Sequence, residues 1–239
     1  MVRGLVLAAG RGSRMGDATE DKPKCLNILD GRTLLDWQLN SLHKAGVNQL
    51  IVVRGYLKEM LVGEYEVVNN LRWDETNMVS SLFCVSAFKG DTIISYSDIA
   101  YKAQHVSDLI ASKGDITITA DIKWLDLWKI RFEDPLEDAE SFKSDGSKLL
   151  EIGGEALTVG EIEAQYMGLI KLTSKGWRIM KAHFDSLSAE RKDEMDMTTM
   201  LNELLKNSIS INVVFINGGW CEADSYEDIL AYEKALFEN

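Results

Sequence analysis

Cysteine is scarce in this sequence, and its three copies are scattered. Cys25, Cys84 and Cys221 lie far apart, and none of them belongs to a closely spaced CxxC pair. This pattern argues against a zinc site or a disulfide framework and favours free thiols in a reducing compartment.

Long apolar runs and an excess of basic residues are also missing. No stretch reaches the roughly 18 apolar residues that a membrane span needs, and the apolar run 5–9 is too short for a signal peptide. Acidic residues outnumber basic ones by 38 to 26, giving a net charge of −12, which argues against binding to nucleic acid or acidic membranes. We therefore expect a cytoplasmic protein that binds neither nucleic acid nor membranes. If it binds a polyanionic phosphate, it must do so at a locally basic site. The oligomeric state stays open.

Proline occurs only at Pro23 and Pro135, and the chain contains no repeats, low-complexity tracts or linkers. Its 239 residues suffice to bury a substantial core. One compact domain is expected.

Strand-like and helix-like segments alternate along the chain. In the first half, the pattern predicts strands at 4–9, 49–53, 65–68, 91–95 and 116–120, and helices at 33–45, 77–88 and 106–112. In the second half, it predicts a hairpin over 141–152, strands at 164–172 and 211–216, and helices at 175–187, 198–206 and 225–237. The fold class is therefore α/β and Rossmann-like, a mostly parallel mixed sheet flanked by helices, with a small substrate-side β/α insertion. Ligands of such sheets gather beyond the carboxyl ends of the strands, so the loops after Ala9, Val68 and Ser95 are where a site is expected.

The first predicted strand runs directly into a glycine-rich, basic loop. Residues 5–26 read LVLAAGRGSRMGDATEDKPKCL. Gly10 and Gly12 let backbone N–H groups curl around phosphate oxygens. Arg11 and Arg14 can add charge-assisted contacts, and Pro23 stiffens the turn that presents a lysine on either side of it. The loop is therefore a candidate phosphate site.

Three interpretations of this loop compete on spacing alone. It could be a tight strand-to-helix turn with solvated basic residues. A Walker A loop is excluded because the Gly-Lys-Ser/Thr ending is absent. A dinucleotide fingerprint is weak, because Met15 stands at the third glycine position and Arg54-Gly55 replaces the expected acidic residue.

The string LAAGRGSRM-xxx-T-xx-KPK, residues 7–24, resembles the signature of the sugar-phosphate and choline-phosphate nucleotidyltransferase superfamily. The resemblance extends through most of the chain. It implies that Arg14 lies near the leaving pyrophosphate and that Lys24 acts between the α-phosphate and the acceptor's phosphate, both as catalytic residues. The implied triphosphate-binding residues are Leu7, Ala8, Ala9, Gly10, Arg11, Gly12 and Ser13.

The resemblance also implies Mg²⁺ as a cofactor. In the superfamily, one aspartate after a central strand and one from a late E-x-D-like segment hold the metal, and Asp98 and Asp224 match these positions. Such hard oxygen ligands suit Mg²⁺. On the residues alone, Asp98 could be a loop aspartate without a role, and Asp224 an acidic residue favoured near a helix N-terminus.

The segment 69–82, NNLRWDETNMVSSL, lacks the Gly-Thr-Ala-like element that sugar nucleotidyltransferases have beside the base. It resembles instead the choline-phosphate and phosphonate cytidylyltransferase branch. The resemblance implies that Thr76, Asn77, Ser80 and Ser81 bind the nucleotide, and such amide and hydroxyl groups can read the edge of cytosine. Thr76 or Asn77 could equally cap the following helix.

On the acceptor side, the strings 124–142 and 163–168 resemble cytidylyltransferase domains of phosphonate biosynthesis. Basic side chains could bind the anionic group of the acceptor, and carboxylate or amide side chains could bind an amine on it. The candidate acceptor-binding residues are Lys123, Arg131, Glu163, Gln165, Tyr166, Asp196 and Glu222. Solvated surface charge or helix capping is the ordinary alternative for the charged ones. Aromatic residues of this half could form a cage for a cationic head group or simply pack in the core.

Together these features predict one nucleotidyltransferase domain over 1–239, with a nucleotide-binding half at 1–122 and an acceptor-binding, closing half at 123–239. The predicted partners are CTP and a small phosphonate or phosphorylated acceptor, 2-aminoethylphosphonate- or phosphocholine-like. CMP is transferred by direct in-line attack, with release of pyrophosphate. A sugar-1-phosphate nucleotidyltransferase and a non-catalytic nucleotide-binding regulator are the alternatives.

Overall fold

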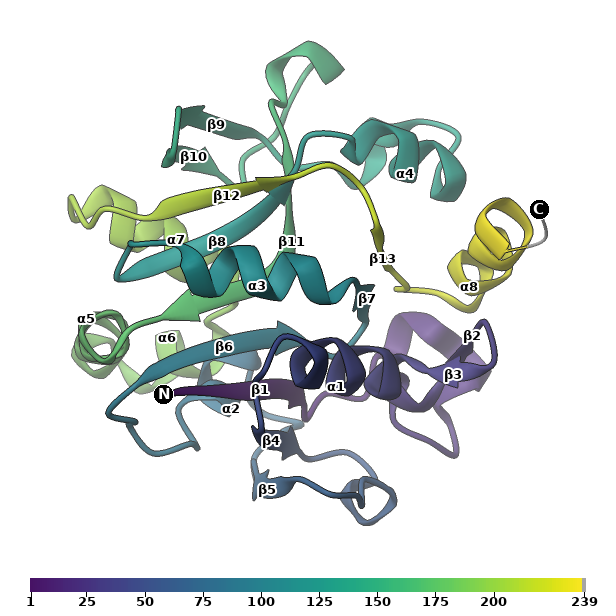
Figure 1. Ribbon diagram of the computed structural model, residues 1–239, viewed down its shortest axis with the longest axis horizontal. Coiled ribbons are helices and arrows are strands. Elements are labelled where there is room, and N and C mark those ends of the chain that lie inside the picture. The colour runs from purple at the N-terminus through teal and green to yellow at the C-terminus, as the bar shows by residue number, and fades with distance from the viewer. Residues whose placement is uncertain (238–239) are drawn as a thin grey trace.

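The computed structural model describes residues 1–237, which fold around a nine-stranded sheet (Figure 1). The strand order is β5-β4-β1-β6-β11-β8-β12-β10-β9. The bounds are β1 (Val2–Ala8), β4 (Gln49–Arg54), β5 (Glu66–Asn69), β6 (Asp91–Tyr96), β8 (Ile116–Asp121), β9 (Phe142–Asp145), β10 (Lys148–Ile152), β11 (Gln165–Leu172) and β12 (Asn212–Ile216). Strands β5, β4, β1 and β6 are parallel, as are β8 and β12, whereas β11 is antiparallel to both its neighbours. The predicted mostly parallel mixed sheet is confirmed.

The order in which strands are added to the sheet reverses at β1. The chain first adds β4 and β5 on one side of β1, and then returns to pair β6 with the other side. Such a reversal opens a crevice at the carboxyl ends of the two central strands. Leu5 and Ile94, partners in this pairing, are fully buried. The loops after Ala8 and Tyr96 therefore emerge together at one edge of a rigid core.

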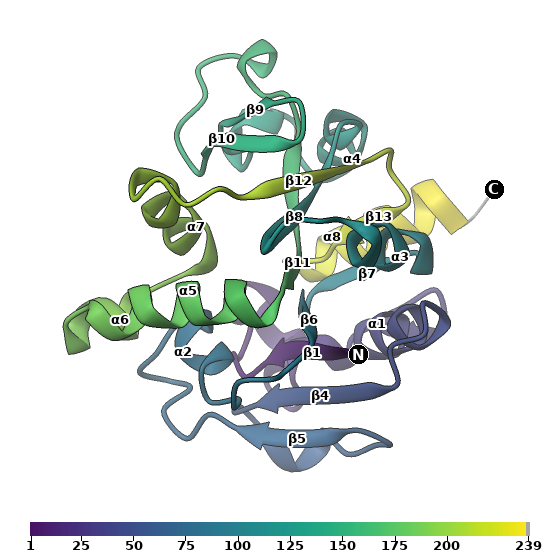
Figure 2. The same cartoon turned by 60° about the vertical axis from the view of Figure 1, so that its left-hand side comes forward.

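Helices cover both faces of the sheet, which is seen nearly edge-on in Figure 2. One face carries α1 (Leu34–Lys44), α3 (Ala103–Ala111), α4 (Trp124–Arg131) and α8 (Tyr226–Tyr232), and the other carries α2 (Met78–Leu82), α5 (Ser174–Ser186), α6 (Ala189–Glu194) and α7 (Met197–Lys206). Among residues 1–237, no helix has the length and apolar character required to cross a bilayer.

Several helix ends follow from side-chain caps. The Thr33 hydroxyl accepts a hydrogen bond from the Asp36 amide at 3.0 Å at the start of α1, and Gly46, with φ of 84°, follows its end. Ser225 begins α8 through a capping box with Asp228. After α8 the chain continues as a π-helical turn over Glu233–Phe237. The predicted starts of these two helices are confirmed.

The helix predicted at 77–88 is shorter in the structure, because α2 ends at Leu82. The amides of Cys84 and Val85 donate to carbonyls three residues back, so the chain tightens into turns. The Phe83 ring then packs against Trp177, with ring centroids 5.6 Å apart. Tertiary packing under α5 thus overrides the local helical pattern.

Two short ribbons lie outside the main sheet. One joins β2 (Ile28–Leu29) to β3 (Arg32–Thr33), and the other joins β7 (Ile99–Tyr101) to β13 (Trp220–Glu222). The sequence did not predict the second ribbon, since its two strands have three residues each and lie far apart in the chain. This ribbon carries acidic residues at its ends to the sheet edge described above.

Candidate active site

The loop after β1 forms one wall of a cavity of about 270 Å³ at the edge where β1 and β6 end. Gly12 has φ of 72°, and a Cβ atom there would lie 2.7 Å from the Lys24 side chain, so glycine is what allows this lysine to pass the loop. The loop residues that line the cavity are Leu7, Ala9, Gly10, Gly12, Ser13 and Arg14. The remaining lining residues are Lys24, Trp73, Thr76, Asn77, Met78, Ser81, Tyr96, Ser97 and Asp98.

Two residues of the predicted loop set do not bring their side chains to this cavity. Ala8 is the last residue of β1 and its side chain is buried in the core. Arg11 is exposed, and its guanidinium lies 5.6 Å from the centroid of the Tyr56 ring. That Arg11 contacts phosphate stays a prediction, since its side chain lies over Tyr56 and does not line the cavity.

Lys24 lies at the base of the cavity, in a short 3₁₀ turn that follows Pro23. Its Nζ atom is 2.8 Å from Asp98 Oδ2 and 2.7 Å from Asp224 Oδ1, and its side chain is only 8% exposed. Burial alone would lower the pKa of Lys24, but the carboxylates of Asp98 and Asp224 raise it above its ordinary value. Lys24 is therefore a fixed positive charge at neutral pH.

Three carboxylates meet beside this lysine. Asp98, Glu222 and Asp224 each offer an oxygen within 4.8 Å of the others. The β7–β13 ribbon brings them together, and the Ala223 amide donates to the Asp98 carbonyl at 2.9 Å. Asp98 Oδ1 is buried and has no hydrogen-bond partner in the described part of the chain. Such a set of hard oxygen donors fits a divalent cation.

Arg131 holds the carboxylate cluster from the side opposite to solvent. Its side chain is 1% exposed and contacts Glu222 at 3.2 Å, Asp224 at 3.1 Å and Asp228 at 3.2 Å. The prediction that Arg131 binds the acceptor's anion is therefore wrong for this structure, because its guanidinium is already saturated by carboxylates. Glu222, predicted to bind the acceptor, lies instead with the other two cluster carboxylates.

The pKa values of Asp224 and Glu222, two carboxylates of the cluster, are shifted in opposite directions. Burial would raise the pKa of Asp224, but the cations of Lys24, Arg14 and Arg131 lower it. Burial, together with the carboxylates of Asp224 and Asp98, raises the pKa of Glu222 to about 8. Asp224 is thus ionised at neutral pH, whereas the Glu222 carboxyl is mostly protonated at that pH.

Replacing Arg131 by methionine is expected to lower the free energy of unfolding by about 3 kcal/mol, because the buried carboxylates of Asp224 and Asp228 lose a counter-charge. Urea unfolding followed by circular dichroism measures this change. The exposed Arg178→Met variant is the matched control and should change by less than about 0.5 kcal/mol. Equal stability of the two variants would contradict the role given to Arg131.

The base-side residues are held by a polar network. Asn70 Nδ2 donates to Thr76 Oγ1 at 2.9 Å and to Ser81 Oγ at 3.0 Å. Asn77 is the N-cap of α2, so the capping alternative is confirmed. Ser80 does not line the cavity, since its hydroxyl donates to the Lys192 carbonyl at 2.8 Å. Thr76, Asn77 and Ser81 remain candidates for contact with a base.

Two aromatic lining residues, Trp73 and Tyr96, were missed from the sequence. Trp73 packs beside Gly55, where a Cβ atom would lie 2.4 Å from the tryptophan side chain. Tyr96 is the last residue of β6, next to the loop that carries Asp98. An aromatic residue at the carboxyl end of a central strand was the available signal for Tyr96.

Three predicted acceptor residues have structural roles beside the cavity. The Gln165 side chain bonds both the amide and the carbonyl of Glu140. The Tyr166 ring packs edge-on against Tyr96 with centroids 5.8 Å apart. Asp196 caps α7, accepting from the Thr199 amide at 2.7 Å. They shape the surroundings of the cavity, and Gln165 and Tyr166 do not line it directly.

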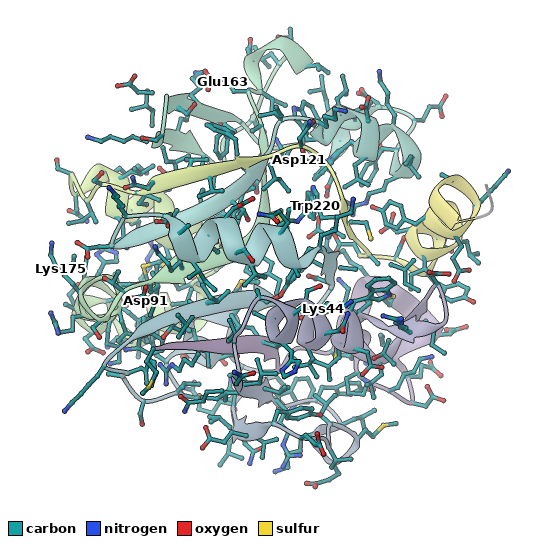
Figure 3. All side chains as sticks on the ribbon, viewed as in Figure 1. Lys44, Asp91, Asp121, Glu163, Lys175 and Trp220 are labelled. Atoms are coloured by element: carbon teal, nitrogen blue, oxygen red, sulfur yellow. The ribbon has the colours of Figure 1, made fainter. Side chains whose placement is uncertain are left out.

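Two other predicted acceptor residues lie elsewhere. Glu163 accepts from the amide of Ser144 in β9 at 2.9 Å, and Figure 3 shows it near the top of the molecule. Lys123 precedes α4 and lines a different cavity, of about 610 Å³, with Trp220. Neither Glu163 nor Lys123 lines the cavity at the glycine loop, so the structure does not bring these two predicted acceptor residues to it.

A Rossmann-like sheet whose central strands end in a glycine-rich loop, a buried lysine and a carboxylate cluster defines the nucleotidyltransferase class. The sequence pattern of the MobA-like NTP transferase domain family matches residues 4–126. The chain belongs to this family, and the class predicted from its sequence is confirmed.

Several relatives within the class are cytidylyltransferases. The CTP:phosphoglutamine cytidylyltransferase of Campylobacter jejuni is 36% identical over 244 residues, which cover 94% of this chain and 96% of that protein. The 2-aminoethylphosphonate cytidylyltransferase of Lancefieldella rimae is 32% identical over 110 residues, 43% of this chain and 45% of that protein. The solved structure of the CTP:phosphocholine cytidylyltransferase of Streptococcus pneumoniae has a TM-score of 0.73 at 20% identity, covering 98% of this chain and 99% of that one. The last comparison confirms the predicted fold.

Proposed function

We propose that this protein transfers CMP from CTP to a small phosphorylated or phosphonate acceptor and releases pyrophosphate. The observation that carries the proposal is the meeting of the glycine loop, Lys24 and the carboxylate cluster at one cavity. The alignment with a cytidylyltransferase over 94% of the chain supports cytosine as the base. By the same proposal, residues 1–122 bind the nucleotide and residues 123–239 bind the acceptor and close the site.

The carboxylate cluster is the proposed Mg²⁺ site, held by Asp98, Glu222 and Asp224. The buried, unpartnered Asp98 Oδ1 and the hard oxygen donors support this assignment. When bound, Mg²⁺ would neutralise charge that develops on the phosphates. The negative charge of the cluster also holds two cations, since Arg14 and Lys24 contact Asp224 at 3.0 Å and 2.7 Å.

The cations act on the phosphates by position and charge. Backbone N–H groups of the loop after β1 bind the triphosphate. Lys24 lies between the α-phosphate and the acceptor's phosphate and neutralises the negative charge on their oxygens. Arg14, 69% exposed and 3.0 Å from Asp224, is free at the rim to follow the leaving pyrophosphate. An acceptor phosphate or phosphonate is already ionised at neutral pH, so no general base is required. Catalysis rests on alignment and electrostatic stabilisation.

The base is proposed to lie by α2. Asn70 fixes the hydroxyls of Thr76 and Ser81, and Trp73 offers an aromatic surface on the same side of the cavity. Fixed hydroxyls and amides can distinguish the amide-like edge of a pyrimidine. This arrangement supports selection among bases but does not identify the acceptor.

A matrix of nucleotides and acceptors tests the proposal. Pyrophosphate release is measured with CTP, UTP, dTTP, ATP and GTP against phosphocholine, 2-aminoethylphosphonate, N-phosphorylated glutamine and hexose 1-phosphates. CTP is expected to exceed every other nucleotide by roughly a hundredfold in kcat/KM with its best acceptor. Preference for UTP or dTTP with a hexose 1-phosphate would show a sugar nucleotidyltransferase instead.

Metal affinity is expected to depend on pH through Glu222. Because the pKa of Glu222 is raised to about 8, a metal ion must displace its proton at lower pH. The Kd for Mn²⁺, measured calorimetrically without nucleotide, should fall by about tenfold per pH unit from 6 to 7.5 and level off above 8. Glu222→Gln should bind more weakly and with a flatter profile. A parent Kd that is constant over this range would contradict the assignment of Glu222.

A further inference from the structure

A second, larger cavity adjoins the nucleotide cavity. Its volume is about 590 Å³, and Met78 and Tyr96 belong to the walls of both. The far wall is one face of α7, which continues over Thr198, Asn202 and Lys206. These three residues are four apart, so they share a face of the helix. Since an acceptor must approach the phosphates from a neighbouring space, its head group is expected in this cavity.

Some charged residues of the second cavity are already engaged. Asp196 caps α7 through the amide and hydroxyl of Thr199. Glu203 contacts His183 and Arg191. These carboxylates therefore have little capacity left for a ligand.

Four other lining side chains have no internal partner. Within residues 1–237, the side chains of Glu140, Thr198, Asn202 and Lys206 make no hydrogen bond or ion pair. They supply one carboxylate, one hydroxyl, one amide and one ammonium group. The cavity thus offers one negative and one positive side chain without a partner. A site for a purely cationic head group would not need the positive one.

The backbone of Glu140 has a defined position, and its side chain is exposed at the cavity. Gln165 holds the Glu140 backbone through both its amide and its carbonyl. At Gly153, with φ of 78°, a Cβ atom would lie 2.2 Å from the Thr198 methyl and 3.8 Å from Glu140 Oε2. Glu140 is thereby placed at the N-terminal end of α7, beside Thr198. The backbone of Lys206 lies about 12 Å further along the helix axis than that of Thr198, and its side chain is exposed at the same face.

The cavity offers little to a quaternary ammonium group. Tyr96 is the only aromatic residue among its lining residues in the described chain, and its ring is already packed against Tyr166. A trimethylammonium group is usually recognised by several aromatic faces. A primary ammonium group instead gains charge-assisted hydrogen bonds from a carboxylate and a hydroxyl.

We propose that the acceptor is a phosphorylated or phosphonate derivative of an amino acid, whose ammonium binds Glu140 and Thr198 and whose carboxylate binds Asn202 and Lys206. This inference rests on the proposed cytidylyl transfer. Together with the phosphoryl group beside Lys24, the two contacts hold the acceptor at three points. Three-point attachment distinguishes mirror images, so the enzyme should prefer one enantiomer of its acceptor.

The test compares acceptors in the full-length protein with CTP and Mg²⁺, with pyrophosphate release as the readout. The probes are the side-chain phosphoramidates of L- and D-glutamine, 2-aminoethylphosphonate, which lacks the carboxylate, and phosphocholine. One glutamine enantiomer should exceed the other, and both smaller acceptors, by at least about tenfold in kcat/KM.

Two variants connect this preference to the cavity. Glu140→Gln should raise the KM of the preferred enantiomer about tenfold and leave the KM of CTP unchanged. Lys206→Met should reduce its advantage over 2-aminoethylphosphonate about tenfold. Lys113→Met, at an exposed lysine on the opposite face, is the matched control and should match the parent protein.

The possible outcomes distinguish failure of this inference from failure of the proposed cytidylyl transfer. Equal or better use of phosphocholine or 2-aminoethylphosphonate, or an unchanged preference in both cavity variants, would overturn the amino-acid acceptor while cytidylyl transfer stands. If no acceptor releases pyrophosphate from CTP, the proposed function fails and this inference fails with it.

Discussion

Replacing Asp98 by alanine is expected to lower metal-dependent pyrophosphate release from CTP by roughly a thousandfold. Asp98 reaches the cluster from the loop after β6, and its Oδ1 atom has no hydrogen-bond partner among residues 1–237. Its other oxygen contacts Lys24 at 2.8 Å, so this one carboxylate joins the proposed metal to the proposed catalytic cation. Removing it affects both. Initial rates over a range of Mg²⁺ concentrations measure the loss.

The fold should tolerate this change, because the Asp98 main chain keeps its hydrogen bond from the Ala223 amide. Circular dichroism and thermal unfolding check that point. Asp126→Ala, which removes an exposed carboxylate on α4, is the matched control and should retain the parent rate. An Asp98→Ala protein that is folded and turns over CTP at the parent rate would exclude the proposed metal site.

Replacing Lys24 by methionine is expected to lower kcat by roughly a hundredfold to a thousandfold, with a much smaller change in the KM of CTP. The reason is that Lys24 is a buried, permanently charged group whose proposed partners are the reacting phosphates. The same change leaves Asp98 and Asp224 without their shared counter-charge. The metal-free variant should therefore lose about 3 kcal/mol of unfolding free energy, and Mn²⁺ should restore part of it by binding the native state.

Lys22 provides the matched control, since it lies on the other side of Pro23 and makes no ion pair in the described part of the chain. Lys22→Met should stay within about twofold of the parent rate. If Lys24→Met raised only the KM of CTP, Lys24 would be a ground-state binding residue and its catalytic assignment would fail.

The sequence was most informative where local patterns decide structure. The run into Gly10 and Gly12 marks a strand followed by a phosphate loop, and the structure lines a cavity with both glycines. The alternation of strands and helices predicted the sheet, because buried parallel strands are apolar throughout. The apolar pattern from residue 33 predicted the start of one helix, and the capping chemistry of Ser225 predicted the start of another.

Sequence reasoning failed where contacts between distant segments decide the outcome. Arg131 looked like a free cation near an acceptor, but packing of α4 against α8 places it among carboxylates. Glu222 was separated from the metal pair because only the β7–β13 ribbon shows that it reaches Asp98. No local pattern marked Glu140 as an acceptor candidate, since its surroundings come from α7 and the loop at Gly153.

The central claim is that the CMP group moves intact from CTP to a phosphoryl oxygen of the acceptor. The most direct test is ³¹P NMR with mass spectrometry of a reaction containing CTP, Mg²⁺ and the best acceptor of the matrix. We predict one pyrophosphate for each new CMP–acceptor diester, with a phosphorus–oxygen–phosphorus linkage between CMP and the acceptor. Release of free CMP, or a nucleotide that survives with its triphosphate intact, would contradict the account.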